Sequence, residues 1–375
     1  MRLPLGCGDW SGKTVRLHRA IYGLKQASRT WGMHLSNVLT ALDFEQCLSD
    51  PCVFRCFSGK EILLTLAHRI DGMFVVGHAS ECNALCVELN NMFPAKNLGE
   101  LKWYTGCAFT RDRKAGKIKV TQTAYVDQIC ERFSVITTSP IPGATSLKLL
   151  PLQGHEEQCE EKFRALIGVL LWVANMTRPD IANSVHPLAR HMQAPSKTHW
   201  KAGLRVLKFL RKTRDWGTGQ TRLYAYADSS YSGDEDDQRS VSGGPVMFAG
   251  SLVAWFSRTQ QFVALSSTEA EYMATGECVK ELLLLNNALR FVQPLRGVEN
   301  NTLWVYKDNM GAINLAEKSS SSARSKHIDV RHHFLRQLVQ DRRIEILPTP
   351  TYSQHADIPT KPLGESLFNF MLVHC

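Results

Sequence analysis

From residue 222 onward, the order of strand and helix patterns restricts the possible folds of this chain more than any other feature. Three short apolar runs follow one another closely: "RLYAYAD", "GGPVMFAG" and "LVAWFSR". Their spacing is typical of an antiparallel meander. A helical period then extends from about 267 to 291, after which the strand patterns "TLWVYKD" and "RIEILPT" alternate with helical segments. This order predicts a mixed five-stranded sheet with helices packed against it.

The preceding residues predict two further regions. The first is mixed α/β, with an amphipathic helix within "AIYGLKQASRTWGMHLSNVLTALDF" and a hairpin whose turn is Asp71-Gly72. A connector rich in Pro, Gly, Ser and Thr follows and leads into several helices. We therefore expect an α/β (α+β) chain with three domains, at 1–136, 137–220 and 221–375.

The formal net charge of +9 is unevenly distributed. Residues 1–220 contain 29 Lys and Arg against 18 Asp and Glu, whereas residues 221–375 contain 15 against 17. A basic region attracts phosphate backbones, and a faintly acidic region can hold carboxylates for cations. No membrane partner is expected, because the longest apolar stretch, "LIGVLLWVANM", is far shorter than the roughly 20 residues of a membrane span. The 11 cysteines, an odd number, favour free thiols in a reducing intracellular compartment.

Four acidic residues of the last domain occupy comparable positions. Asp228 and Asp308 each end a predicted strand. Glu271 lies in the first turn of the long helix, and Asp357 begins the final helix. Two carboxylates about 4 Å apart repel by roughly 4 kcal/mol at an effective dielectric near 20, so a cluster of four requires a cation or bound protons. An all-oxygen cluster suits Mg²⁺ or Mn²⁺, and paired ions of this kind promote phosphodiester cleavage.

Glu271 also has a purely structural interpretation. Within "LSSTEAEYMATGE", Thr268 and Glu271 match the S/T-x-x-E capping box, in which the two side chains satisfy each other's backbone N–H groups. This pattern alone leaves both capping and catalysis open.

A basic stripe is predicted on the helix "KTHWKAGLRVLKFLRKTRDWG". Cationic side chains recur every three or four residues along one face, at Lys197, Lys201, Arg205, Lys208 and Lys212. A solvated face is the alternative, but the single sign of charge over several turns favours contact with phosphates.

Many ordered motifs resemble those of copia-type retrotransposon polyproteins. Residues 222–363 are similar to the ribonuclease H domain of that family, through "YADSSYSGDEDDQRSVSG", "AWFSRTQQFVALSSTEAEYMA", "YKDNMGAINLA", "SKHIDVRHHF" and "HADIPTKPL". Residues 15–220 resemble the back half of its reverse transcriptase, a partial palm with a thumb-like region, through "RLHRAIYGLKQASRTW", "SDPCVF", "LGELKWYTG" and "MTRPDIANSV". The resemblance covers nearly all of the chain and implies a location in cytoplasmic virus-like particles or in the nucleus.

The resemblance also implies which acids bind metal. The family's glutamate falls on Glu271 and not on Glu269, and its other acids fall on Asp228, Asp308 and Asp357. Two ions, Mg²⁺ or Mn²⁺, are implied, with Asp228 bridging both. Glu271 and Asp308 would bind one ion and Asp357 the other. The implied reaction is endonucleolytic hydrolysis of RNA in an RNA–DNA hybrid, recognised through the 2′-hydroxyl. The implied partners are that hybrid and other products of the polyprotein.

Some positions depart from the family pattern. An acid is usual where Ser230 stands, and Trp where Tyr231 stands. Pro359 interrupts the first turn of the last helix, where proline is tolerated. Lys307 precedes Asp308 at a position where a small residue is common, and could compete with a metal ion.

The polymerase region lacks the signature of the family. Tyr-Val-Asp-Asp is replaced by Arg69-Ile70-Asp71-Gly72, so Asp71 alone remains of two metal-binding acids. The earlier palm aspartate belongs upstream of "YGLKQ", and we expect that the chain begins too late to contain it, since Asp9 has no matching setting. Loss of the paired-ion ligands predicts loss of polymerase activity.

Nucleic-acid contacts are still expected in both regions. Lys25 and Gln26 of "YGLKQ" are intact, as is the basic helix. Arg324, Lys326 and His327 are candidates for a phosphate contact, with a surface or capping role as the alternative for the histidine.

Two hypotheses follow for the whole chain. In the first, it is a truncated retroelement polyprotein that retains a metal-dependent ribonuclease H, while the defective polymerase region holds the substrate. In the second, it is a catalytically inactive remnant that at most binds nucleic acid. Retention of all four acids favours the first hypothesis, and the altered polymerase hairpin favours the second.

Overall fold

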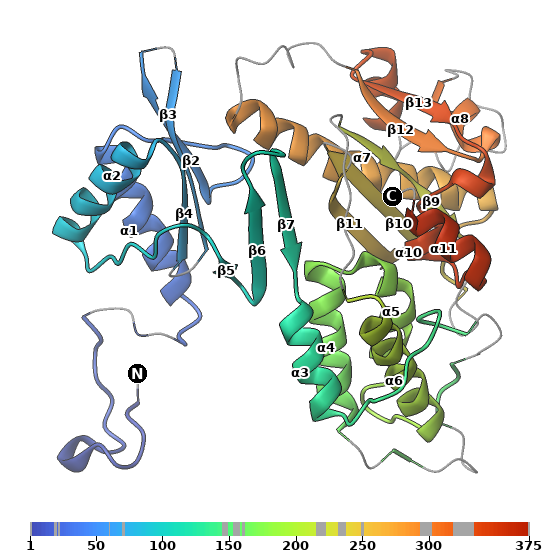
Figure 1. Ribbon diagram of the computed structural model, residues 1–375, viewed down its shortest axis with the longest axis horizontal. Helices are drawn as coiled ribbons and strands as arrows, with labels where there is room; N and C mark the ends of the chain where they lie inside the picture. Colours follow the sequence, from blue (N-terminus) through green and yellow to red (C-terminus); the bar gives the residue numbers. More distant parts are fainter. Residues whose placement is uncertain are drawn as a thin grey trace. The chain divides into compact units, whose positions relative to one another are not determined.

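Figure 1 shows the computed structural model of the chain. The structure describes residues 2–18, 21, 23–59, 61–69, 72–144, 149–152, 158–159, 162–214, 223–231, 238–248, 251–292, 302–317 and 334–373. The chain divides into two units: the first is Met1–Glu100 with Asn287–Glu299, and the second is Leu101–Asn286 with Asn300–Cys375. The three domain ranges expected from the sequence stay a prediction.

The first unit contains a four-stranded antiparallel sheet with two helices. The strands follow the order β1-β2-β3-β4. The elements are a 3₁₀ turn η1 (Gly8–Trp10), α1 (Ala27–Ala41), β1 (Glu45–Gln46), β2 (Val53–Ser58), β3 (Glu61–Arg69), β4 (Gly72–Gly77) and α2 (Ala79–Met92). Leu35 and Leu39, one helical turn apart on α1, are fully buried in one core with Phe54 and Leu66 of the sheet. The amphipathic helix and the β3–β4 hairpin predicted from the sequence are therefore present.

The second unit begins with a small sheet and a group of helices. Its first elements are β5 (Trp103–Tyr104), β6 (Cys107–Asp112), β7 (Lys117–Thr121), α3 (Thr123–Arg132), α4 (Phe163–Met176), η2 (Pro179–Ile181), α5 (Ala182–Arg190) and α6 (Lys197–Lys212). Helix α4 is apolar on most sides because it lies in the centre of this group, where Leu166, Ile167 and Leu170 are fully buried. Within the described residues, every helix lacks the length or the apolar character required to cross a bilayer.

The second unit continues with the mixed sheet that the sequence predicts. Its strands are β8 (Tyr224–Tyr226), β9 (Asp228–Ser230), β10 (Val241–Phe248), β11 (Ser251–Thr259), β12 (Leu303–Lys307) and β13 (Ile344–Pro348). They follow the order β11-β10-β8-β12-β13, and β9 pairs with β10 beyond the end of β8. Strand β10 is antiparallel to β8 and β11, whereas β12 is parallel to β8 and β13. The predicted fold class is confirmed, with six strands in five positions because Ala227 interrupts the first strand.

Two consecutive glycines show that helices cover both faces of this sheet. The accompanying helical elements are α7 (Ser267–Val292), α8 (Met310–Glu317), η3 (Thr351–Ser353), α10 (Asp357–Thr360) and α11 (Glu365–Val373). A Cβ atom on Gly243 would meet Thr360 and Pro359 of α10, whereas one on Gly244 would meet Phe256 and Cys278, the latter on α7. Successive residues of a strand point to opposite faces, so α10 and α7 lie on opposite faces of β10 (Figure 1).

One helix boundary differs from the sequence-based expectation. Asp357 does not begin the final helix but begins the one-turn helix α10, and the final helix α11 starts later. The chain leaves the helical conformation at Lys361, whose φ and ψ are −129° and 145°. Pro362 follows directly and disfavours a helical conformation for the residue before it. Pro359 is accommodated inside the single turn, as proline in a first turn can be.

Replacement Gly243→Ala is expected to destabilise the second unit. The added Cβ would lie 2.5 Å from Cγ2 of Thr360 and 2.9 Å from Cγ of Pro359, both of which are buried, so α10 would have to move. Overpacking of this kind costs about 1–3 kcal/mol, measurable as a lower free energy of unfolding in urea.

Gly276→Ala is the matched control. A Cβ at this position of α7 meets nothing within 4 Å, and alanine in a helix is expected to stabilise the protein by about 0.5–1 kcal/mol. If both alanine variants changed the stability equally, the close approach of α10 to β10 would be wrong.

Candidate carboxylate site

Asp228 lies at the centre of the candidate site. It is the first residue of β9, directly after the interruption at Ala227, and its register partner on β10 is Gly243. The side chain has no solvent exposure. The Thr360 hydroxyl donates a hydrogen bond of 2.5 Å to its Oδ2 atom. A carboxylate in this position requires compensating partners, because burial strongly disfavours an isolated charge.

Glu271 faces the same site because other residues cap its helix. The backbone N–H of Glu269 donates to Oγ of Ser266 at 3.1 Å, and the N–H of Leu265 donates to the Glu269 carboxylate at 2.7 Å. The capping interaction is thus made two residues earlier than the Thr268–Glu271 pattern suggested. Glu271 is left buried, 8% exposed, with its carboxylate directed towards the sheet.

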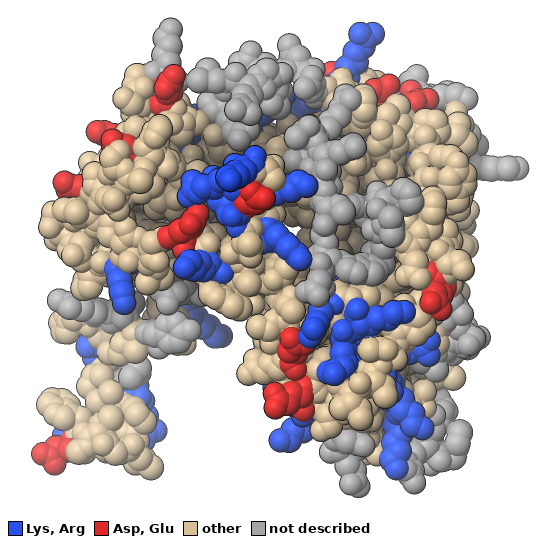
Figure 2. Space-filling view, viewed as in Figure 1, with Lys and Arg blue, Asp and Glu red and all other residues tan. Residues whose placement is uncertain are grey.

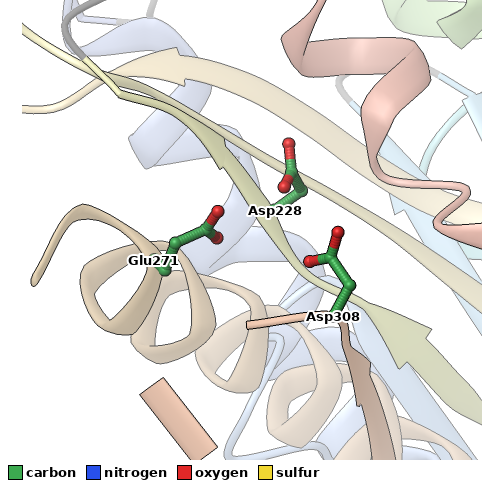
Figure 3. A group of neighbouring side chains, drawn as sticks. All are labelled: Asp228, Glu271 and Asp308. Atoms are coloured by element: carbon green, nitrogen blue, oxygen red, sulfur yellow. The ribbon is translucent and has the colours of Figure 1, made fainter. Parts of the chain in front are cut away.

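Asp308 completes a group of three carboxylates. It follows β12 directly, in the parallel part of the sheet. One oxygen from each of Asp228, Glu271 and Asp308 lies within 4.8 Å of the other two. Figure 3 shows these side chains pointing towards one another from β9, α7 and the end of β12. The expected convergence of strand ends and a helix start is therefore present for three of the four acids.

Asp357 reaches this group through a lysine. It begins α10 and is buried. The Lys361 ammonium lies 2.7 Å from Oδ1 of Asp357 and 3.2 Å from the Asp228 carboxylate, so it bridges the two acids. Asp357 is not one of the three mutually adjacent carboxylates, and its link to them is this ion pair.

A second lysine occupies the middle of the three-carboxylate group. Lys307 has no solvent exposure, and its ammonium donates a hydrogen bond of 2.7 Å to the backbone carbonyl of Ala227. The same ammonium contacts the Glu271 carboxylate directly. It lies 3.9 Å from Asp228 and 3.7 Å from Asp308. Lys307 therefore acts as a cation for all three acids.

The pKa values of the buried carboxylic acids differ, because burial and the two ammonium groups act on them to different extents. Burial raises the pKa of Glu271 to about 7, against the opposing effect of Lys307. Burial and the nearby charge of Asp228 raise the pKa of Asp357 to about 7. Burial acts in the same direction on Asp228, but Lys307 and Lys361 outweigh it and hold the pKa of Asp228 below its usual value. Of these three acids, Asp228 is thus the one held in its charged form.

The donor atoms fit a divalent metal ion, but Lys307 does not. Three clustered carboxylates could hold such an ion, and oxygen donors without His or Cys suit a hard cation. The Lys307 ammonium already lies in contact with Glu271 and within 4 Å of the other two acids. A metal ion at the same place would face a positive charge at close range.

Several residues of the site were not identified from the sequence. Thr360 and Lys361 follow Asp357 at the i+3 and i+4 positions, which share one side of a helix, so the motif "HADIPTKPL" contained a usable signal for both. Gln354 donates to the carbonyl of Ala227 at 3.2 Å and to Asp308 at 3.4 Å. No local pattern marks Gln354, because its role depends on two distant segments.

The predicted basic helix is present as α6. Ser196 caps it, in a capping box completed by His199. Lys197, Lys201 and Lys212 are exposed, whereas Arg205 and Lys208 are half-buried. In the first unit, Lys25 and Gln26 are exposed just before α1. The remaining predicted phosphate contacts, Arg324, Lys326 and His327, lie outside the described residues, as does Asp71 of the predicted degenerate polymerase site.

A cavity lies between α6 and residues that adjoin the carboxylate site. It has a volume of about 540 Å³, and its lining includes Arg190, Arg205, Ser230 and Thr360. Thr360 is the residue whose hydroxyl binds Asp228. The cavity therefore extends from cationic side chains of α5 and α6 to the edge of the site.

The β6–β7 hairpin is a basic surface that the sequence analysis did not single out. Figure 2 shows Lys and Arg side chains gathered where Figure 1 places these strands. The exposed cations of the hairpin are Arg111, Arg113, Lys114, Lys117 and Lys119. A strand pattern alone does not distinguish such a surface from an ordinary solvated hairpin.

Comparisons with known proteins agree with this arrangement. A family model described as "Reverse transcriptase (RNA-dependent DNA polymerase)" matches residues 1–145. The Pol polyprotein of transposon TNT 1-94 from Nicotiana tabacum is 34% identical, and the match covers 94% of this chain and 27% of the relative. That of transposon RE2 from Arabidopsis thaliana is 32% identical over 94% of this chain and 24% of the relative. The chain thus spans about a quarter of the length of these relatives.

Among solved structures, ribonuclease H1 from the archaeon Halobacterium salinarum NRC-1 is similar over 41% of this chain and 99% of its own, with 13% identity and a TM-score of 0.26.

The family model identifies residues 1–145 as a reverse-transcriptase region, and the mixed sheet described above is formed by residues that follow this region in the chain. The chain belongs to the copia-type retrotransposon Pol polyprotein family, as its motifs predicted.

Replacement Thr360→Val is expected to lower the free energy of unfolding by about 1–3 kcal/mol, because it removes a hydrogen bond to a buried carboxylate while preserving the shape of the side chain. Urea unfolding measures the change. Thr275→Val is the control, since the Thr275 hydroxyl donates to the helical carbonyl of Glu271 and, among the described residues, to no carboxylate, so little change is expected there. A Thr360 variant as stable as the control would show that this hydroxyl does not hold Asp228.

Proposed function

We propose that the chain hydrolyses RNA within RNA–DNA hybrids at the carboxylate site. The observation that carries the proposal is the convergence of Asp228, Glu271 and Asp308, which come from separate segments and bring carboxylate oxygens within 4.8 Å of one another. Burying like charges together is unfavourable unless the cluster binds cations, so a purely structural origin of this group is the weaker explanation. The family membership of the chain supports the same reaction.

The residues of the chain have distinct roles in this proposal. Asp228 would be the central ligand of the cation site, and Thr360 fixes its orientation. Gln354 fixes Asp308. Glu271 and Asp357 complete the oxygen donors, one from each side of Asp228. A bound Mg²⁺ or Mn²⁺ would supply Lewis-acid activation of the phosphodiester and of the attacking water.

Basic surfaces of the second unit would hold the hybrid. The stripe on α6 and the hairpin β6–β7 both present exposed cations, which neutralise phosphates irrespective of sequence. The cavity lined by Arg205 and Thr360 offers a route for a strand from α6 to the carboxylates. Association with other products of the polyprotein belongs to the same proposal and follows from family membership.

A second candidate function is favoured by one observation. The Lys307 ammonium already neutralises part of the carboxylate group, as a counter-ion would. If it excludes all metal, the chain is a catalytically inactive remnant that binds nucleic acid. The cleavage experiment separates these two functions.

Purified chain is expected to cleave a labelled RNA–DNA hybrid in Mg²⁺ or Mn²⁺ and to leave single-stranded RNA intact. Asp308→Asn should lower the cleavage rate at least about 100-fold, since it removes one negative charge from the carboxylate group on which the proposed cation site depends. Fluorescence anisotropy should find unchanged binding of the hybrid, which assigns the loss to chemistry.

Glu277→Gln is the matched control for that experiment. Glu277 is an acid of α7 whose side chain is 42% exposed and pairs with Lys280, so the rate should not change. Absence of cleavage by the unaltered chain, or equal cleavage by the chain and its Asp308→Asn variant, would contradict the nuclease proposal.

We also propose that the polymerase region is inactive. Support comes from the sequence "RIDG" at the position of the family's catalytic hairpin, where Asp71 is the single acid. Nucleotidyl transfer requires a pair of ions held by several carboxylates. The chain is therefore expected to add no nucleotides to a primer annealed to an RNA template. Primer extension that an Asp71→Asn replacement abolishes would contradict this proposal.

A further inference from the structure

We propose that Lys307 permanently takes the place of one of two cations, so that the chain binds a single divalent ion, on the side of Asp228 that faces Asp357. This inference rests on the proposed function, because it assumes that the same carboxylates are the cation site. It differs from the two-ion site implied by the family resemblance.

The position of Lys307 is fixed by the sheet. Strand β12 alternates buried and half-buried residues from Leu303 to Lys307, so the lysine side chain points into the domain with those of Leu303 and Val305. The strand lies between β8 and β13, and the carbonyl of Lys307 accepts a hydrogen bond of 2.9 Å from Thr349. Moving the ammonium into solvent would require this central strand to shift.

The ammonium is also fully engaged by protein acceptors. It donates to the carbonyl of Ala227 and contacts Glu271, and Asp228 and Asp308 lie within ion-pair distance. The Ala227 carbonyl is available because the first strand is interrupted there. Lys307 therefore has the environment of a bound cation, with oxygen atoms of four residues around it.

Lys361 is a different kind of counter-ion. Its ammonium lies between Asp228 and Asp357, at 3.2 Å and 2.7 Å, but its side chain is 35% exposed. It follows the end of α10 in an extended conformation. This side chain can turn towards solvent without breaking any strand or helix, so an incoming divalent ion can replace it.

The balance of charge agrees with a single site at which a divalent ion can replace a lysine ammonium group. With all four acids ionised, Lys307 and one divalent ion offset three of the four negative charges. A second divalent ion would exceed the carboxylate charge and would lie close to the Lys307 ammonium.

The test is the number of Mn²⁺ ions bound by the full chain, measured by titration calorimetry and by electron paramagnetic resonance of free Mn²⁺. The unaltered chain is expected to bind one ion. Lys307→Met should bind two, because the three carboxylates then lack their cation, and the second ion should bind at least about 100-fold more tightly than any second ion in the unaltered chain.

A Lys307→Met variant can lose stability, since it leaves buried acids without a partner. Its thermal midpoint should fall in EDTA and recover when Mn²⁺ is added. The double variant Lys307→Met/Glu271→Gln keeps the charge balance, and it should fold in EDTA yet bind one ion only. Lys361→Met is the matched lysine control: it should still bind a single ion, more tightly than the unaltered chain does.

The inference is overturned if the unaltered chain binds two Mn²⁺ ions or none, or if folded Lys307→Met binds no more ions than the unaltered chain. These outcomes are separate from cleavage. If the unaltered chain binds one ion and Lys307→Met binds two, but neither cleaves a hybrid, the proposed role of Lys307 stands and the nuclease proposal is refuted. If the unaltered chain binds two ions and cleaves the hybrid, the nuclease proposal stands and the role of Lys307 is refuted.

Discussion

The repulsion among buried carboxylates is the constraint on which the structure of the second unit depends. Asp228 has no contact with solvent, yet it lies beside further acids. Two lysines make this arrangement tolerable, Lys307 within the sheet and Lys361 after α10. A buried charge without such partners would shift its pKa until it became neutral. The two ammonium groups thus compensate the buried negative charge from within the chain.

The backbone around the site is arranged to serve the same interactions. The interruption of the first strand at Ala227 frees a carbonyl for Lys307 and for Gln354, while the N–H of Ala227 still donates to the neighbouring strand at Tyr306. The glycine opposite Asp228, Gly243, lets α10 approach the sheet closely. Local departures from regular sheet structure thus bring partners from distant segments to one carboxylate.

The family resemblance of the motifs implies a different change in each part of the chain. At the proposed polymerase hairpin it implies two acids, whereas this sequence has Asp71 alone. In the later domain it implies the four acids that this sequence contains, and the structure places the Lys307 ammonium among three of them. In our proposals, the first change removes ligands for metal ions and the second supplies a competing positive charge.

The sequence by itself determined the strands, the long helix and the candidate acids, because side-chain periodicity and ordered motifs are local properties of the chain. It also pointed to Lys307 as a possible competitor of metal. The tertiary structure alone decided that Ser266 and Glu269 make the cap that frees Glu271, and that Asp357 reaches the other acids through a lysine. It also decided the direction of the Lys307 side chain. These points depend on packing between segments far apart in the chain, which no local pattern encodes.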